Sequence, residues 1–143
     1  MPAHAPGGNP ASTVPAAPRD GGRAALGRLG ERLAETHLER RGFATLARNV
    51  RTRHGEIDLI VHDGSVLAFV EVKTLRARAG GAPVAPLEGL RGSQRARLRR
   101  LAAAWLGSPE ARPSARTIRF DAIGVVLDRR GALLRLDHIE GAW

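Results

Sequence analysis

Four charged residues in two apolar segments could form a hydrolytic site. Glu56 and Asp58 lie in the segment GEIDLI, and Glu71 and Lys73 lie in the segment FVEVKT. Carboxylates on neighbouring strands can hold a hard divalent cation, which lowers the pKa of water and polarises a phosphate oxygen. An ammonium group beside them can orient the water or stabilise developing negative charge. These residue types point to metal-assisted hydrolysis of a phosphodiester.

Lys73 is the only lysine among the 23 lysine and arginine residues of the chain. Lysine is a compact point charge whose pKa can be lowered by burial, whereas arginine stays charged and presents a planar fork. A site that activates water beside a metal therefore has a reason to keep lysine. The alternative is that one lysine survives by chance in an arginine-rich sequence.

The two apolar segments are predicted to form a β-hairpin. Both are rich in valine, isoleucine and leucine, and the Asp-Gly pair at 63–64 between them is a strong turn signal. With this pair as the turn, the numbers of paired residues sum to 127, so Asp58 lies opposite Phe69 and Glu56 lies opposite Glu71. Because side chains alternate along a strand, the four charged residues share one face of the hairpin.

This predicted face brings three carboxylates close to one ammonium group. Asp58 and Glu71 would be diagonal neighbours, with Cβ atoms roughly 7–8 Å apart. Carboxylates this close repel one another unless a proton or a cation intervenes, and one lysine does not balance three of them. Oxygen ligands suit Mg²⁺ or Mn²⁺. The alternative is a salt bridge of Asp58, Glu71 and Lys73 at the edge of the sheet. Glu56 is either a partner of the site or a solvent-exposed acid.

The elements that must position these residues are predicted in the order α-β-β-β-α-β-β. Helical spacing, apolar runs and Gly/Pro breaks define them. They are a helix at 23–41, a strand at 43–50, the hairpin at 55–74, a helix at 87–106 and strands at 117–128 and 132–141. We predict one α/β domain at 23–143, a mixed sheet flanked by helices, after a disordered Pro/Gly/Ala-rich tail at 1–22.

Each predicted helix places one polar residue at or beside its apolar stripe. Glu31 lies at the edge of the buried face of the first helix, and Gln94 lies on the apolar stripe of the second helix. Glu31 is either a site residue or a solvated acid paired with Arg28 or Arg32. Gln94 is either a site residue or a hydrogen-bonding group at the edge of the core.

The composition favours a polyanionic partner. The 143 residues carry a net charge of +9 and are 43% hydrophobic, which suffices for a core. Candidate phosphate contacts are Arg76, Arg78, Arg91 and Arg95. The alternatives are a composition bias of the coding DNA and a solvated helix face. The chain has no cysteine, and we find no membrane-spanning or secretion segment, so we expect a cytoplasmic protein.

The spacing of the acids and the lysine resembles a known nuclease motif. An acid on one strand, twelve intervening residues and Glu-x-Lys on the next strand are typical of the PD-(D/E)xK superfamily, which includes restriction enzymes and Holliday-junction resolvases. In this sequence, Ile57-Asp58 matches the acid of the first strand, and Glu71-Val72-Lys73 matches the Glu-x-Lys of the second strand. The motif is short and degenerate, so a longer series of matches is more specific.

A longer series of motifs resembles the YraN family of small bacterial proteins, over roughly residues 23–141. The matching motifs are Gly30-Glu31 with Ala34 and Leu38, Arg48-Asn49, GEIDLI, FVEVKT and RFD at 119–121. The resemblance implies a restriction-endonuclease-like fold. It also implies that Glu31, Asp58 and Glu71 are metal ligands and that the lysine of VEVKT, Lys73, is catalytic.

Two functions from different classes follow. The first is a metal-dependent nuclease that uses Mg²⁺ or Mn²⁺ to hydrolyse phosphodiester bonds in DNA rather than RNA, including branched or damaged DNA. The second is a nucleic-acid-binding or accessory protein that keeps the nuclease fold without catalysis. Similarity to resolvases also implies a homodimer, because two strands must be cut.

Overall fold

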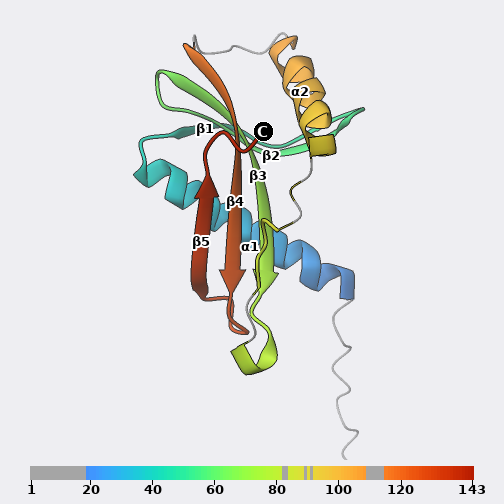
Figure 1. The fold of residues 1–143 in the computed structure, drawn as a ribbon, viewed down its shortest axis with the longest axis vertical. Coiled ribbons are helices and arrows are strands. Elements are labelled where there is room, and N and C mark those ends of the chain that lie inside the picture. The colour runs from blue at the N-terminus through green and yellow to red at the C-terminus, as the bar shows by residue number, and fades with distance from the viewer. Residues whose placement is uncertain (1–18, 82–83, 89, 91, 109–114) are drawn as a thin grey trace, which may run out of the picture.

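Two α-helices and five strands occur in the predicted order, and the sheet is mixed (Figure 1). The computed structural model describes residues 19–81, 84–88, 90, 92–108 and 115–143. The elements are α1 (Arg19–Arg40), β1 (Ala44–Thr52), β2 (Gly55–His62), β3 (Val66–Arg76), the short 3-10 helix η1 (Ala79–Gly81), α2 (Gly92–Leu106), β4 (Thr117–Leu127) and β5 (Leu133–Ile139). The predicted α/β class is confirmed. No helix within the described ranges is long and apolar enough to cross a membrane.

The strands lie in the order β1-β2-β3-β4-β5, and all neighbours are antiparallel except β3 and β4, which are parallel. Antiparallel neighbours can be joined by short turns, whereas a parallel pair needs a crossover connection. The crossover from β3 to β4 contains α2. The second half of β3, with Glu71 and Lys73, therefore leads directly into the crossover.

The β2–β3 hairpin forms as predicted, but the predicted register is wrong by two residues. Phe69 lies opposite Ile60, not Asp58, and the numbers of all paired residues sum to 129 rather than 127. The predicted pairing of Glu56 with Glu71 is wrong for the same reason. A shift of two residues preserves the face to which each side chain points, because the side-chain period of a strand is two.

The turn of this hairpin explains the shift. It is centred on Gly64-Ser65 rather than on Asp63-Gly64, because the backbone N–H of Asp63 bonds to the carbonyl of Val66. The Asp63 carboxylate accepts hydrogen bonds from the backbone N–H groups of Ser65 and Val66, at 2.9 and 2.7 Å. Gly64 has a φ of 99°, which suits glycine at the first central position of a two-residue hairpin turn.

Each face of the sheet carries its own apolar core. The core on the α1 side contains Ala34, Leu38, Phe43, Leu59, Val61, Ala68, Val70, Ile123, Val125 and Leu127. The core on the α2 side contains Ile57, Ile60, Leu67, Phe69, Leu98, Leu101, Ala102 and Trp105. Ile57 was expected to share a face with Leu59, but it packs on the α2 side. The alternation along β2 is therefore interrupted at the residue between them, Asp58.

The first helix starts earlier than predicted. α1 begins at Arg19 instead of Arg23 and ends at Arg40. Gly42, the predicted stop, has a φ of 91°, which is the left-handed conformation that glycine adopts after a helix. Residues 1–18 of the predicted tail lie outside the described residues.

The second helix starts later than predicted. α2 begins at Gly92 rather than near Leu87, because residues 86–88 form a turn in which the Glu88 N–H bonds to the Ala85 carbonyl at 3.1 Å. The apolar stripe is confirmed in its second half, where Leu98, Leu101 and Trp105 are buried.

The closest approach of α1 to the sheet is at Gly30. A Cβ atom built on Gly30 would overlap Oγ1 of Thr74 on β3 and lie 2.8 Å from Thr74 Cβ and Cγ2, whereas a Cβ on Gly27 would meet no atom within 4 Å. Glycine at position 30 therefore lets α1 lie directly against β3. The next residue is Glu31, so this contact also sets the height of Glu31 above the strand.

Substitution of Gly30 tests this contact. Gly30→Ala is expected to lower the free energy of unfolding by about 1–3 kcal/mol, because the added methyl group must displace β3 or α1. Gly27→Ala is the matched control and is expected to raise it by about 0.5–1 kcal/mol through helix propensity. Urea denaturation measures both. Equal effects of the two substitutions would contradict the proposed packing.

Candidate functional site

The candidate site lies where the β2–β3 ladder stops. The last pair of the ladder at this end is Leu59 with Val70. Beyond it, Oδ2 of Asp58 accepts a 2.7 Å hydrogen bond from the backbone N–H of Val72. Continuing the register by one pair would set Asp58 opposite Glu71. The charge of Glu71 is close enough to raise the pKa of Asp58, so the two acids are neighbours, although the register used for the prediction was wrong.

Asp58 is held in an environment that disfavours its charge. Burial is the main cause that raises its pKa to about 6 from an ordinary value of 3.8, and the negative charges of Glu31, Glu71 and Glu56 raise it further. The hydrogen bond from Val72 opposes these effects but is too weak to cancel them. A cation bound beside Asp58 would relieve the same repulsion.

Glu71 pairs with two cations through one oxygen. Its Oε1 lies 3.0 Å from Lys73 Nζ and 3.7 Å from an Nη atom of Arg97 on α2. Its other oxygen, Oε2, is buried and has no hydrogen-bonding partner among the described residues. Buried carboxylate oxygens are normally satisfied, so Oε2 is an acceptor that a bound ligand, water or ion would satisfy.

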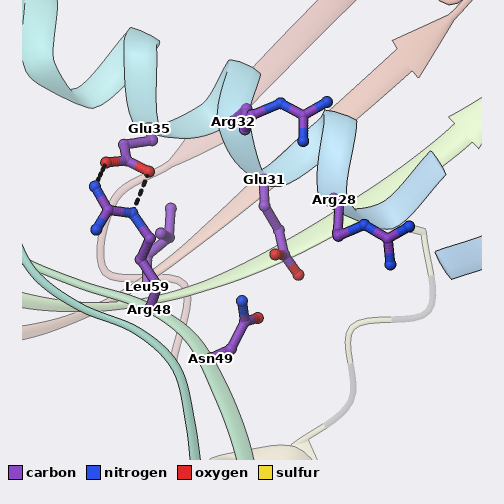
Figure 2. A pocket seen from close by; sticks show the side chains of 7 residues that line it. All are labelled: Arg28, Glu31, Arg32, Glu35, Arg48, Asn49 and Leu59. Carbon is purple, nitrogen blue, oxygen red and sulfur yellow. Dashed lines mark hydrogen bonds and ion pairs between the residues drawn. The ribbon is translucent and has the colours of Figure 1, made fainter. Parts of the chain in front are cut away.

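Glu31 approaches the acids from α1, and Figure 2 shows its side chain directed toward Asn49 of β1. With the Asn49 amide oriented to satisfy its partners, Nδ2 donates to Glu31 Oε2 at 3.2 Å and to Glu56 Oε1 at 3.1 Å. Burial raises the pKa of Glu31, as does the charge of Glu56, whereas Asn49 and Arg28 lower it. One amide thus connects two acids from different elements.

Sequence reasoning missed Asn49 as a residue of the site, and it did not predict that Arg97 pairs with Glu71. Asn49 has a φ of 49°, a left-handed conformation that is rare within a strand and clusters at functional sites. The only sequence signal for Asn49 was its place in the Arg48-Asn49 motif. Nothing in the sequence distinguished Arg97 from the other arginines of α2.

The donor set fits a divalent cation held by two carboxylates. Asp58 and Glu71 supply oxygens that repel one another, and one oxygen of Glu71 has no partner. Mg²⁺ commonly takes one or two carboxylates and completes its coordination with water and substrate oxygens. Within the described part of the chain, no three acidic or histidine side chains already form a metal-binding group. Glu31 therefore fits contact through water better than direct ligation.

The remaining predicted partners of the site lie at its margins. Glu56 is exposed and lies 3.9 Å from Arg51, and it is connected to the site through the amide of Asn49 and through its charge, which raises the pKa of Asp58 and Glu31. Gln94 on α2 is partly buried, and its Oε1 has no partner among the described residues. Gln94 thus has an oxygen available, but no contact joins it to the acids.

The predicted phosphate contacts differ in their surroundings. Arg76 donates to the backbone carbonyls of Asp128 and Arg129, at 3.4 and 2.9 Å, and holds the β4–β5 turn. Arg78 and Arg95 are exposed. Arg91 lies outside the described residues.

Asp121 provides a contrast with Glu71. It is fully buried, and its two oxygens accept hydrogen bonds from Arg119, His138 and the backbone N–H of Gly141, at 2.8 to 3.1 Å. Burial alone would raise its pKa, but these hydrogen bonds hold the pKa below its usual value. The partners of this fully satisfied acid give it a structural role.

Comparison with known proteins finds relatives along most of the chain. The model of the "Uncharacterised protein family UPF0102" matches residues 30–125. A UPF0102 protein of Pelotomaculum thermopropionicum is 44% identical over 121 residues, which cover 85% of this chain and 97% of the relative. UPF0102 proteins of Frankia alni and Streptomyces griseus are each 44% identical over 119 residues, 83% of this chain and 94% and 96% of the relatives.

Asp58→Asn tests the electrostatic description of the site. Because the folded pKa of Asp58 is raised, ionisation disfavours the folded state, and this cost appears as pH rises from about 4 to above 6. In EDTA, Asp58→Asn is therefore expected to raise the free energy of unfolding by about 1–3 kcal/mol at pH 8 and by much less at pH 4. Urea denaturation at both pH values measures this.

Asp137→Asn is the matched control for this experiment, because Asp137 is half exposed on β5 and pairs only with Arg135. It is expected to change stability by less than about 1 kcal/mol at either pH. An Asp58→Asn protein that loses the same stability at pH 4 and pH 8 would show that Asp58 is not under electrostatic strain.

Proposed function

The chain belongs to the uncharacterised protein family UPF0102, as its resemblance to YraN proteins predicted, and we propose that this member is a metal-dependent nuclease. Its reaction would be hydrolysis of phosphodiester bonds in DNA, including branched or damaged DNA. One observation carries the proposal: the partly buried Asp58 and the buried Glu71 lie close together at the end of the β2–β3 ladder, beside the only lysine of the chain. The lack of cysteine fits a cytoplasmic protein.

Asp58 and Glu71 would hold Mg²⁺ or Mn²⁺, and Glu31 would contact the ion through water. When bound, such an ion polarises a phosphate oxygen and lowers the pKa of water. The unpaired Oε2 of Glu71 and the raised pKa of Asp58 support this assignment, because both are relieved by a positive charge. Asn49 would keep Glu31 directed toward the acids.

Lys73 would contact the substrate and would not serve to stabilise the protein core. Its ammonium group is about half exposed and lies 3.0 Å from Glu71, so it can reach a phosphate placed at the acids. There it would orient the attacking water or stabilise negative charge on the phosphate. A guanidinium group would keep the charge but not the compact geometry, which gives a reason for lysine in an otherwise arginine-rich chain.

A non-catalytic nucleic-acid-binding role is the second candidate. The observation that favours it is that no group of three acidic or histidine side chains is assembled for a metal within the described ranges. In this alternative, the acids and Lys73 would form a salt-bridged cluster left from the nuclease fold. DNA binding would then be independent of Asp58.

A cleavage panel with Mg²⁺ and Mn²⁺ decides between the two functions. The panel contains single-stranded, duplex, nicked, flapped and four-way DNA, and the wild-type protein is expected to cleave at least one form. Asp58→Asn is expected to abolish cleavage because it removes a charge that holds the ion. Lys73→Ala is expected to slow it on the order of 100-fold or more, and Lys73→Arg is expected to restore little of the loss.

Thermal unfolding with and without Mn²⁺ supplies a readout that does not need a substrate. The melting temperature of the wild type is expected to rise with Mn²⁺ and that of Asp58→Asn to stay constant, with Asp137→Asn behaving as wild type. Light scattering of the same samples tests the homodimer that cutting two strands would need. If no DNA form is cleaved and Mn²⁺ stabilises neither protein, the nuclease proposal is wrong.

A further inference from the structure

Several arginines of α1 line hollows that also contain Glu31. Three adjoining hollows, of about 360, 400 and 380 Å³, all include Glu31 in their walls. Together they form a groove between α1 and the strands β1 and β3, which we call the α1 groove. Its basic residues are Arg23, Arg28, Arg32, Arg48, Arg51 and Lys73.

Half of these cations are already neutralised by acids. Arg48 forms a two-pronged ion pair with Glu35, with its Nε at 2.8 Å from Oε2, as Figure 2 shows. Arg51 lies 3.9 Å from Glu56, and the lysine of the groove pairs with Glu71. The cations in the walls of the α1 groove are therefore not all available to a ligand.

Three arginines of the α1 groove remain available. Among the described residues, Arg23, Arg28 and Arg32 make no ion pair within 4.0 Å. All three are exposed, and Figure 2 shows Arg28 and Arg32 on either side of Glu31. At about 1.5 Å of rise per residue, Arg28 and Arg32 are about 6 Å apart along the helix axis, and Arg23 is about 7.5 Å further.

We propose that the α1 groove binds the phosphodiester backbone of a nucleic-acid strand through Arg23, Arg28 and Arg32. The proposal rests on the proposed function only for the nature of the polyanion. The reason is electrostatic: Glu31, Asp58 and Glu71 repel a phosphate chain, so the strand needs cations close by that no acid has neutralised. The arginines in the walls of the hollows around Glu31 meet that need, so a strand bound by them would pass Glu31.

This assignment moves the main phosphate contacts from α2 and the loop after β3 to α1. Of the residues predicted from the sequence, Arg76 is engaged with backbone carbonyls. Arg95 lies on the exposed side of α2, and no hollow that includes Glu31 reaches it. Arginines on α1 are therefore expected to contribute more to binding than those on α2.

Fluorescence anisotropy with labelled single-stranded DNA, in EDTA and over a series of salt concentrations, tests the proposal without any need for cleavage. The double variant R28A/R32A is expected to bind at least 10-fold more weakly than wild type. It should also reduce the slope of log affinity against log salt by about 1.4, since each lost phosphate contact on a single strand removes about 0.7.

Two matched variants remove the same charge elsewhere. R40A/R116A changes two exposed arginines that make no ion pair with any described residue, one at the end of α1 and one just before β4. R95A/R99A changes two exposed arginines of α2. Both are expected to weaken binding less than threefold, with thermal unfolding as the check that all variants fold.

Two results would overturn the proposal: absence of DNA binding by the wild type, or a loss in R28A/R32A no larger than in the matched variants. Cleavage bears on a separate point. If no DNA is cut but R28A/R32A still loses affinity and salt dependence as expected, the α1 groove is a binding site and only the nuclease proposal fails.

Discussion

The candidate site depends on one hydrogen bond, from the backbone N–H of Val72 to the carboxylate of Asp58. A side chain thus takes the place of a backbone acceptor for the N–H of Val72, and the regular β2–β3 pairing ends next to this bond. Asp58 is thereby fixed next to Glu71 in a partly buried position where its charge is costly. Because Ile57 turns to the α2 core at the same point, the interruption is also built into the packing.

Two buried acids of this protein show how a structural carboxylate differs from one that can bind a ligand. Asp121 has four hydrogen bonds on its two oxygens, which hold it ionised and join α1, β4 and β5 through His138 and His37. Glu71 is nearly as buried but uses one oxygen for two cations and leaves the other unpaired. Burial alone therefore does not distinguish these two acids, whereas the number of partners of their oxygens does.

The sequence was sufficient for properties that depend on periodicity and insufficient for those that depend on tertiary contacts. Glu71 and Lys73, two residues apart on β3, share a side and form an ion pair whatever the register of the hairpin, because side chains alternate along a strand. Asp58 lies close enough for the charge of Glu71 to raise its pKa, although the register used to predict their proximity was wrong. The error in register came from Asp63, whose carboxylate closes a turn one residue further on. The role of Asn49 requires a left-handed backbone inside β1 and an acid from α1, and no local pattern contains either.

The packing of α1 links the stability of the fold to the geometry of the site. Gly30 allows the helix to touch Thr74 of β3, one residue after Lys73 in sequence. A residue larger than glycine would overlap Thr74, so α1 or β3 would have to shift and the position of Glu31 relative to Asn49 and Asp58 would change. Because the α1 groove lies between the same elements, its shape would change as well. The contact at Gly30 thus sets both the position of the third acid relative to the other two and the position of the α1 arginines beside them.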